Sequence, residues 1–144
     1  MNADIHNIIF MSRIVTLTEA ASLAIHAMVL IAQTDHQINV NFIAEQTGAS
    51  RNHLAKVMQR LVKDGLVKST RGPLGGFKLA KKPEEISILT IYEAIEGSIK
   101  VDGCPFDRPI CPFHLCLMGN IISKVTIDIR QYFEEQTLDK FING

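Results

Sequence analysis

Apolar side chains recur every three or four positions in three early stretches of the chain, which is the spacing of an amphipathic helix. The first stretch begins at Thr16 or Thr18 and predicts a helix that ends near residue 33. The second predicts a shorter helix that is capped by Asn39 or Asn41 and ends at Gly48, and the third predicts a helix that is capped by Ser50 and ends at Gly65. The first half of the chain is therefore expected to be mainly helical.

The pattern changes after Gly65. Residues 66–70 and 77–80 read as two short strands, and the segment 71–76 between them contains three glycines that permit a tight loop. A short helix, a turn, a helix with a polar face and a basic hairpin together predict a winged helix-turn-helix. The glycine-rich loop lacks the Gly-Lys-Ser/Thr end of a phosphate-binding loop and does not open a helix, so we assign no nucleotide site to it.

Two more helices are predicted in the second half. The sequence from Thr90 predicts a helix to about Glu96, whereas residues 97–112 show no periodicity. Apolar residues from Leu117 to Phe133 then form a long stripe, which predicts a helix of about twenty residues. This stripe needs a covering surface, either the first helix of the same chain or a second copy. We favour the second copy, because a dimer reads a two-fold DNA site.

The predicted fold class is mainly α: a winged helix-turn-helix with a two-stranded wing plus a long C-terminal dimerisation helix. We divide the chain into an N-terminal extension (1–15), a DNA-binding domain (16–83) and a region with the cysteine loop and dimerisation helix (84–144). With 144 residues, 47% of them apolar, the chain can bury such a core. Its apolar runs are shorter than the roughly 18 residues of a membrane span, so we expect a cytoplasmic protein without a membrane partner.

Charge is segregated along the sequence, although the formal net charge is zero. Residues 51–82 carry nine Lys or Arg and one acidic residue, whereas the rest of the chain carries six basic and fourteen acidic side chains. Such a basic block is a candidate surface for a polyanion. A solvated basic face without a partner has the same composition, so the arrangement of residues within the block decides between the two interpretations.

The third predicted helix has an apolar face and a basic, amide-bearing face. Its first turn offers hydrogen-bond donors and no carboxylate, as a helix that approaches phosphates and base edges requires. Asn52 can bond an adenine edge with two hydrogen bonds, Gln59 can do so from farther along, and Arg71 at the wing tip suits a narrow minor groove. The predicted residues for binding double-stranded promoter DNA are Ser50, Arg51, Asn52, His53, Lys56, Gln59, Arg60, Lys63 and Arg71.

Three cysteines lie close together in the aperiodic region. An odd number of cysteines in a reducing compartment indicates metal or redox chemistry rather than a disulfide framework. Zinc sites of this size usually contain a CxxC pair, which this sequence lacks, so zinc and redox thiols rank below an iron–sulfur cluster without being excluded. The predicted metal ligands are Cys104, Cys111 and Cys116.

These motifs resemble those of the IscR/NsrR-type bacterial transcription regulators. The similarity runs from about Leu17 to Phe141 and is carried by SRNHLAKVMQRLVKDGLV at 50–67, RGPLGGFKLAK at 71–81 and the three cysteines. It implies a dimeric winged-helix protein with an iron–sulfur cluster, either [2Fe–2S] or [4Fe–4S], on those cysteines. The residues that it places at the DNA are Asn52, His53, Lys56 and Arg71.

The resemblance also bears on the fourth cluster ligand. In this family the first helix of the other subunit can reach the cysteine loop, and one branch resembles this sequence in using a histidine there. His26 stands one helical turn after Ser22 and is the predicted ligand. His114, Glu19 and a non-protein ligand are the alternatives, and a packed core histidine is the competing interpretation of His26.

Two functions from different classes follow from this pattern. The first is a homodimeric DNA-binding transcription regulator, expected to be a repressor, whose cluster senses redox state, nitric oxide or cluster availability. The second is a redox or metal-handling protein, a cluster or zinc carrier, in which the basic face is incidental. The sequence shows no nucleophile–base pair and no phosphate loop, so we expect neither an enzyme nor a small-molecule substrate.

Overall fold

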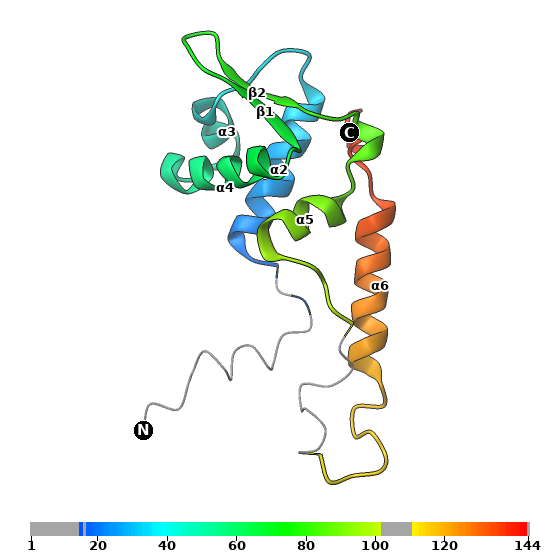
Figure 1. The fold of residues 1–144 in the computed structure, drawn as a ribbon. Helices are drawn as coiled ribbons and strands as arrows, with labels where there is room; N and C mark the ends of the chain where they lie inside the picture. Colours follow the sequence, from blue (N-terminus) through cyan, green and yellow to red (C-terminus); the bar gives the residue numbers. More distant parts are fainter. Residues whose placement is uncertain (1–14, 16, 102–110, 144) are drawn as a thin grey trace, which may run out of the picture. The chain divides into compact units, whose positions relative to one another are not determined.

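The computed structural model describes residues 15, 17–101 and 111–143, whose elements are drawn in Figure 1. Of the predicted extension, only Val15 is among them. The chain divides into two compact units, each considered by itself below. The winged unit comprises Leu17–Ser98 and Tyr132–Gly144, and the cysteine unit comprises Met1–Thr16 and Ile99–Gln131. Across the described ranges, no helix is both long and apolar enough to cross a bilayer.

Three helices begin the winged unit, and their bounds are α2 (Glu19–Gln33), α3 (Val40–Thr47) and α4 (Arg51–Lys63). Each starts at a capping residue whose side chain accepts a hydrogen bond from a backbone N–H three residues on. These caps are Thr18, Asn39 and Ser50. The three predicted helices are confirmed, and of the two predicted starting points for α2, Thr18 is its N-cap. Gly48 ends α3 in a left-handed conformation with a φ of 71°, which glycine adopts without strain.

The wing is an antiparallel pair of strands, β1 (Val67–Thr70) and β2 (Gly76–Leu79), as predicted. Ile38, which precedes α3, extends it, because its backbone exchanges two hydrogen bonds with Phe77 at 2.8 and 3.4 Å. A Cβ on Gly76 would lie 2.6 Å from the Ile38 carbonyl oxygen, so this close approach requires glycine. The sequence pattern did not predict this additional bridge, because a single residue pair leaves no periodicity.

The core of the winged unit lies among α2, α4 and α5 (Ile88–Glu96). The stripe predicted on α4 is buried, and its members are Leu54, Val57, Met58 and Leu61. The predicted start of α5 at Thr90 is wrong. Ser87 caps this helix, and its hydroxyl oxygen accepts from the Thr90 backbone N–H at 3.1 Å and lies 2.9 Å from the Thr90 hydroxyl oxygen.

The C-terminal end of the chain packs within the same winged unit. Two backbone hydrogen bonds hold this end to the segment that follows the short helix η1 (Pro83–Glu85). The Ile88 N–H donates to the Gln136 carbonyl at 2.8 Å. The Leu138 N–H donates to the Ile86 carbonyl at 3.0 Å. Thr137 precedes the final short helix η2 (Leu138–Phe141), and its side chain makes no capping bond. Leu138 is fully buried.

The last long helix, α6 (Ile121–Glu135), spans the boundary between the two units. It is 15 residues long, shorter than the predicted helix from Leu117. Gly119 and Asn120 have positive φ angles of 57° and 61°, which a right-handed helix does not contain, so α6 begins after them. Within α6, Thr126 is the one residue classed as buried.

Candidate DNA-binding surface and cysteine segment

The first turn of α4 presents hydrogen-bond donors to solvent. The Ser50 hydroxyl oxygen accepts from the His53 backbone N–H at 3.2 Å, which fixes the start of the helix. Arg51 and Asn52 are exposed and His53 is half-buried. One guanidinium nitrogen of Arg51 donates to the side-chain oxygen of Asn41 on α3, at 3.2 Å. This contact holds Arg51 and leaves it further donors, because a guanidinium carries five.

The polar face of α4 is cationic along its length. Its buried stripe faces the core, and the side chains on the opposite face are exposed, namely Lys56, Gln59, Arg60 and Lys63. Basic residues in the last turn also interact favourably with the helix dipole. The helix contains no acidic residue, so nothing on it offsets this charge. The predicted DNA-binding residues of α4 therefore share one positive surface of the winged unit.

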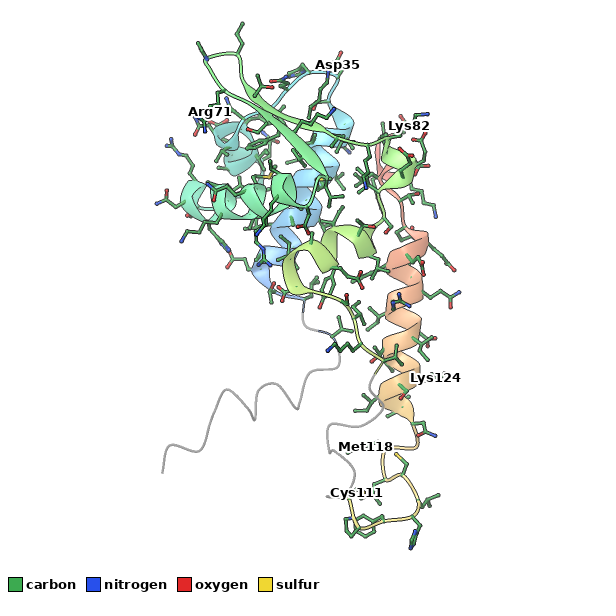
Figure 2. The ribbon with its side chains drawn as sticks, viewed as in Figure 1. Asp35, Arg71, Lys82, Cys111, Met118 and Lys124 are labelled. Atoms are coloured by element: carbon green, nitrogen blue, oxygen red, sulfur yellow. The ribbon has the colours of Figure 1, made fainter. Side chains whose placement is uncertain are left out.

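The wing adds further positive charge, and Figure 2 labels Arg71 in the loop that joins its strands. Arg71 is exposed, as are Lys68 and Lys78. Asp35 is an acidic residue near this hairpin. A hydrogen bond with the His36 ring at 2.9 Å, its own backbone N–H and the charges of His36 and Lys78 lower the pKa of Asp35 below its usual value. The hydrogen bond and the nearby charges thus favour the ionised form of Asp35.

A mostly apolar groove of about 580 Å³ runs along α2 and contains the predicted ligand His26. Its lining includes Leu23, Ile25, Val29, Leu30, Ile88 and Phe141. His26 is exposed, so the interpretation of this residue as a packed core histidine is wrong. Its Nδ1 lies 2.7 Å from the Ser22 carbonyl oxygen, which can only accept, so Nδ1 carries the proton. In the neutral ring, Nε2 then keeps a lone pair that can bind a metal.

Two of the three predicted cysteine ligands lie in the described part of the cysteine unit. Cys111 is half-buried and Cys116 is exposed, and both are thiols. Cys104 lies outside the described residues. Over the ranges that the structure does describe, no three His, Cys, Asp or Glu side chains gather into a metal site. The donor chemistry of two thiols fits iron or zinc, and the ligand set with Cys104 and His26 remains a prediction.

Sequence reasoning missed two residues on this surface. Asn41 belongs to α3, and its contact with Arg51 depends on the packing of α3 against α4. Leu74 lies at the tip of the wing, and neither the charge nor the glycine content of this loop indicated a role for it. Its position between Pro73 and Gly75, in a loop with too few residues to bury a side chain, was the available signal.

Comparison with known proteins places these features in context. The sequence profile of the Rrf2 family, described as iron-dependent transcriptional regulators, matches residues 17–144. The HTH-type transcriptional regulator IscR of Pectobacterium atrosepticum is 29% identical over 130 residues, which cover 89% of this chain and 79% of that protein.

Two solved structures share the fold. IscR of T. potens superposes with a TM-score of 0.72 at 26% identity and covers 90% of this chain and 87% of its own. CymR of B. subtilis, described as the global cysteine regulator, superposes with a TM-score of 0.73 over 90% of this chain and 97% of its own. At 20% identity, the second likeness concerns the fold alone. The predicted winged-helix fold class is confirmed.

Proposed function

Because the chain belongs to the Rrf2 family of transcriptional regulators, we propose that it is a homodimeric repressor that binds promoter DNA through α4 and the wing. We further propose that an iron–sulfur cluster on Cys104, Cys111 and Cys116 sets its affinity for DNA. The observation that carries the DNA-binding proposal is the exposed, acid-free face of α4 beside a basic hairpin in the same compact unit.

The arrangement of the winged unit suits the two grooves of DNA. In a helix-turn-helix the second helix enters the major groove, where Asn52 can pair with an adenine edge and Lys56 can neutralise a phosphate. Arg71 extends from the wing toward the adjacent minor groove. The bond from Arg51 to Asn41 reduces the number of conformations that the guanidinium loses on binding, which favours a contact with the backbone at this point.

The cysteine unit contains side chains that can ligate iron, which supports the regulatory part of the proposal. Cys116 and His114 are exposed and Cys111 is half-buried, so incoming iron can reach them from solvent. A bound cluster would be lost when oxidants attack it or when iron is scarce. Its presence would therefore report on both conditions. The chain's part is to provide deprotonated thiols in the loop and, from the partner's first helix, the Nε2 atom of His26.

Dimerisation is supported by apolar surface that one chain leaves uncovered. Ile121 and Tyr132 lie on the apolar stripe of α6 and are exposed at 51% and 59%. The groove along α2 is apolar as well. Exposed apolar side chains are costly in water and are enriched at interfaces between subunits. A two-fold dimer would present two α4 helices to two half-sites.

Titration of a DNA duplex selected by the protein from a random pool tests DNA recognition. Lys56→Ala should reduce the slope of log affinity against log salt by about one unit, because it removes one phosphate contact. Asn52→Ala should cost about 1–3 kcal/mol, mainly at one base pair. Lys124→Ala, which removes an exposed lysine of α6, is the matched control and should leave the slope unchanged. An unchanged slope for Lys56→Ala would remove this residue from the interface.

The absorption spectrum and iron content of protein purified without oxygen test the cluster. We expect a brown protein whose visible bands are altered by His26→Ala and not by His114→Ala. A colourless protein with stoichiometric zinc would overturn the cluster and favour the metal-handling alternative. Sequence-specific DNA retention separates the two functions, because a metal carrier requires none.

A further inference from the structure

The tip of the wing carries an apolar side chain among cations. Leu74 is 95% exposed, more than any other large apolar side chain among the described residues. The exposed side chains of Lys68, Arg71 and Lys78 lie on the same hairpin. Figure 1 shows the loop between β1 and β2 projecting away from the helices of the winged unit. This tip therefore offers one apolar contact within a positively charged surface.

The loop holds Leu74 in a fixed place. The Gly75 N–H donates to the Gly72 carbonyl at 2.9 Å, which closes a β-turn with Pro73 and Leu74 at its centre. Proline at the first central position presets its own φ, so few conformations remain for the turn. A Cβ on Gly75 would lie 2.1 Å from the Thr70 carbonyl oxygen, which shows how tightly the loop folds against β1. Leu74 is thus presented with little conformational entropy left to lose.

In the unbound protein the side chain of Leu74 lies in water and contributes no hydrophobic stabilisation. Moving its side chain out of water would strengthen a complex by about tenfold or more if burial were complete. DNA has apolar surface in the thymine methyl groups of the major groove, which α4 would occupy, and in the sugar walls and base steps of the minor groove, which the wing would face. Architectural proteins insert leucine and similar side chains there as wedges, which unstack a base step and bend the duplex.

We propose that Leu74 inserts into the minor groove as an apolar wedge and that the bound DNA bends at this step. The inference rests on the proposed function, because α4 must occupy the major groove for the wing to reach the neighbouring minor groove. Arg71 precedes the turn and is drawn to the negative potential of a narrow minor groove, which places Leu74 over the base pairs beside it. DNA sequences with an easily unstacked pyrimidine–purine step at this position should bind best.

The test measures bending and affinity separately. The probe is a 30-base-pair duplex that the full-length protein has selected from a random pool, with a fluorescence donor and acceptor at its two ends. Wild-type protein should raise energy transfer between the ends. Leu74→Ser, which keeps the charge of the wing, should lose most of this increase and weaken binding about tenfold. Leu74→Met, which keeps an apolar side chain of similar size, should retain both properties.

Leu17→Ser provides the matched control, since Leu17 is also an exposed leucine but precedes the N-cap of α2. It should change neither energy transfer nor affinity. If Leu74→Ser bends and binds DNA like the wild type while Lys56→Ala weakens binding, the proposal that Leu74 acts as a wedge is wrong and the proposed function stands. The same result is expected if the tip of the wing contacts a protein or a lipid surface instead of DNA. If the wild-type protein selects no duplex, both proposals are wrong.

Discussion

Helices α4 and α6 have similar lengths, 13 and 15 residues, and both carry an apolar stripe, yet only the stripe of α4 is buried, whereas Ile122, Val125 and Ile129 on α6 are half-buried. Four apolar side chains of α4 are buried, whereas the one buried residue of α6 is Thr126. Periodicity in a sequence shows that a helix has a face to bury. It does not show whether the same chain or another molecule buries it.

The polar faces of the two helices differ as well. Outside its stripe, α4 carries basic and amide side chains and no carboxylate. In α6, Lys124 and Arg130 alternate with Asp128 and with two glutamates near its end. A mixed face does not attract a polyanion, whereas a face of one sign does. This difference supports the proposal that α4 contacts DNA and that α6 contacts a second copy of the protein.

The largest expected effect concerns α6. Replacing Val125 with Glu would place an unpaired carboxylate in the proposed dimer interface, at a cost of about 3–5 kcal/mol to association. Sedimentation velocity at micromolar concentration should then show monomers. Lys124→Glu introduces a carboxylate on the exposed side of the same turn and should leave the dimer intact. A wild-type protein that sediments as a monomer at this concentration contradicts this proposal.

A core substitution in α4 sharpens the comparison. Leu54 is fully buried, so Leu54→Ala should lower the free energy of unfolding by about 2–5 kcal/mol through lost burial and a cavity. The loss should not depend on protein concentration, because it arises within one chain. Ile121→Ala should instead lower stability more at high than at low concentration, since it weakens association. Urea unfolding at two concentrations distinguishes these responses, and a concentration-independent loss for Ile121→Ala would indicate that its own chain covers it.

Although the wing is largely exposed, its stability should fall when Gly76 is substituted. In Gly76→Ala the new methyl group would meet the Ile38 backbone at 2.6 Å, which should cost about 1–3 kcal/mol as an overpacking strain. Hydrogen exchange should report faster opening at Phe77, whose N–H donates to Ile38, and DNA affinity should fall. Lys78→Ala changes an exposed neighbour on the same strand and should leave exchange at Phe77 unchanged. Equal exchange rates in the two variants would show that the bridge does not hold the wing.

The smallest effects concern how the two helices begin. Ser50→Ala removes the side-chain acceptor for the His53 N–H and should destabilise the protein by about 1 kcal/mol, measured as a shift in the urea midpoint. Asn120→Gly, at the start of α6, should change stability by only a few tenths of a kcal/mol, because glycine accepts the same positive φ. A large loss in Asn120→Gly would show that the asparagine side chain itself is required there.

The sequence predicted elements whose signals are local. Caps at Asn39 and Ser50, the glycine at the end of α3 and the hairpin of the wing each depend on residues within a few positions of one another. The basic face of α4 follows from helix geometry alone. Fold class and the position of the candidate DNA surface could therefore be predicted, whereas the roles of individual residues at the DNA and at a cluster stay predictions.

Tertiary structure decided what depends on contacts between distant residues. The bridge from Ile38 to Phe77, the bond between Arg51 and Asn41 and the docking of η2 through Leu138 join segments that are 10 to 52 positions apart, and no periodic pattern encodes such pairs. The exposure of His26 likewise follows from which face of α2 the other helices cover. Local backbone geometry, and hence the sequence, determines which face of each helix must be covered. Apolar contact has no preferred direction, so only the packing of the folded protein decides which element covers that face.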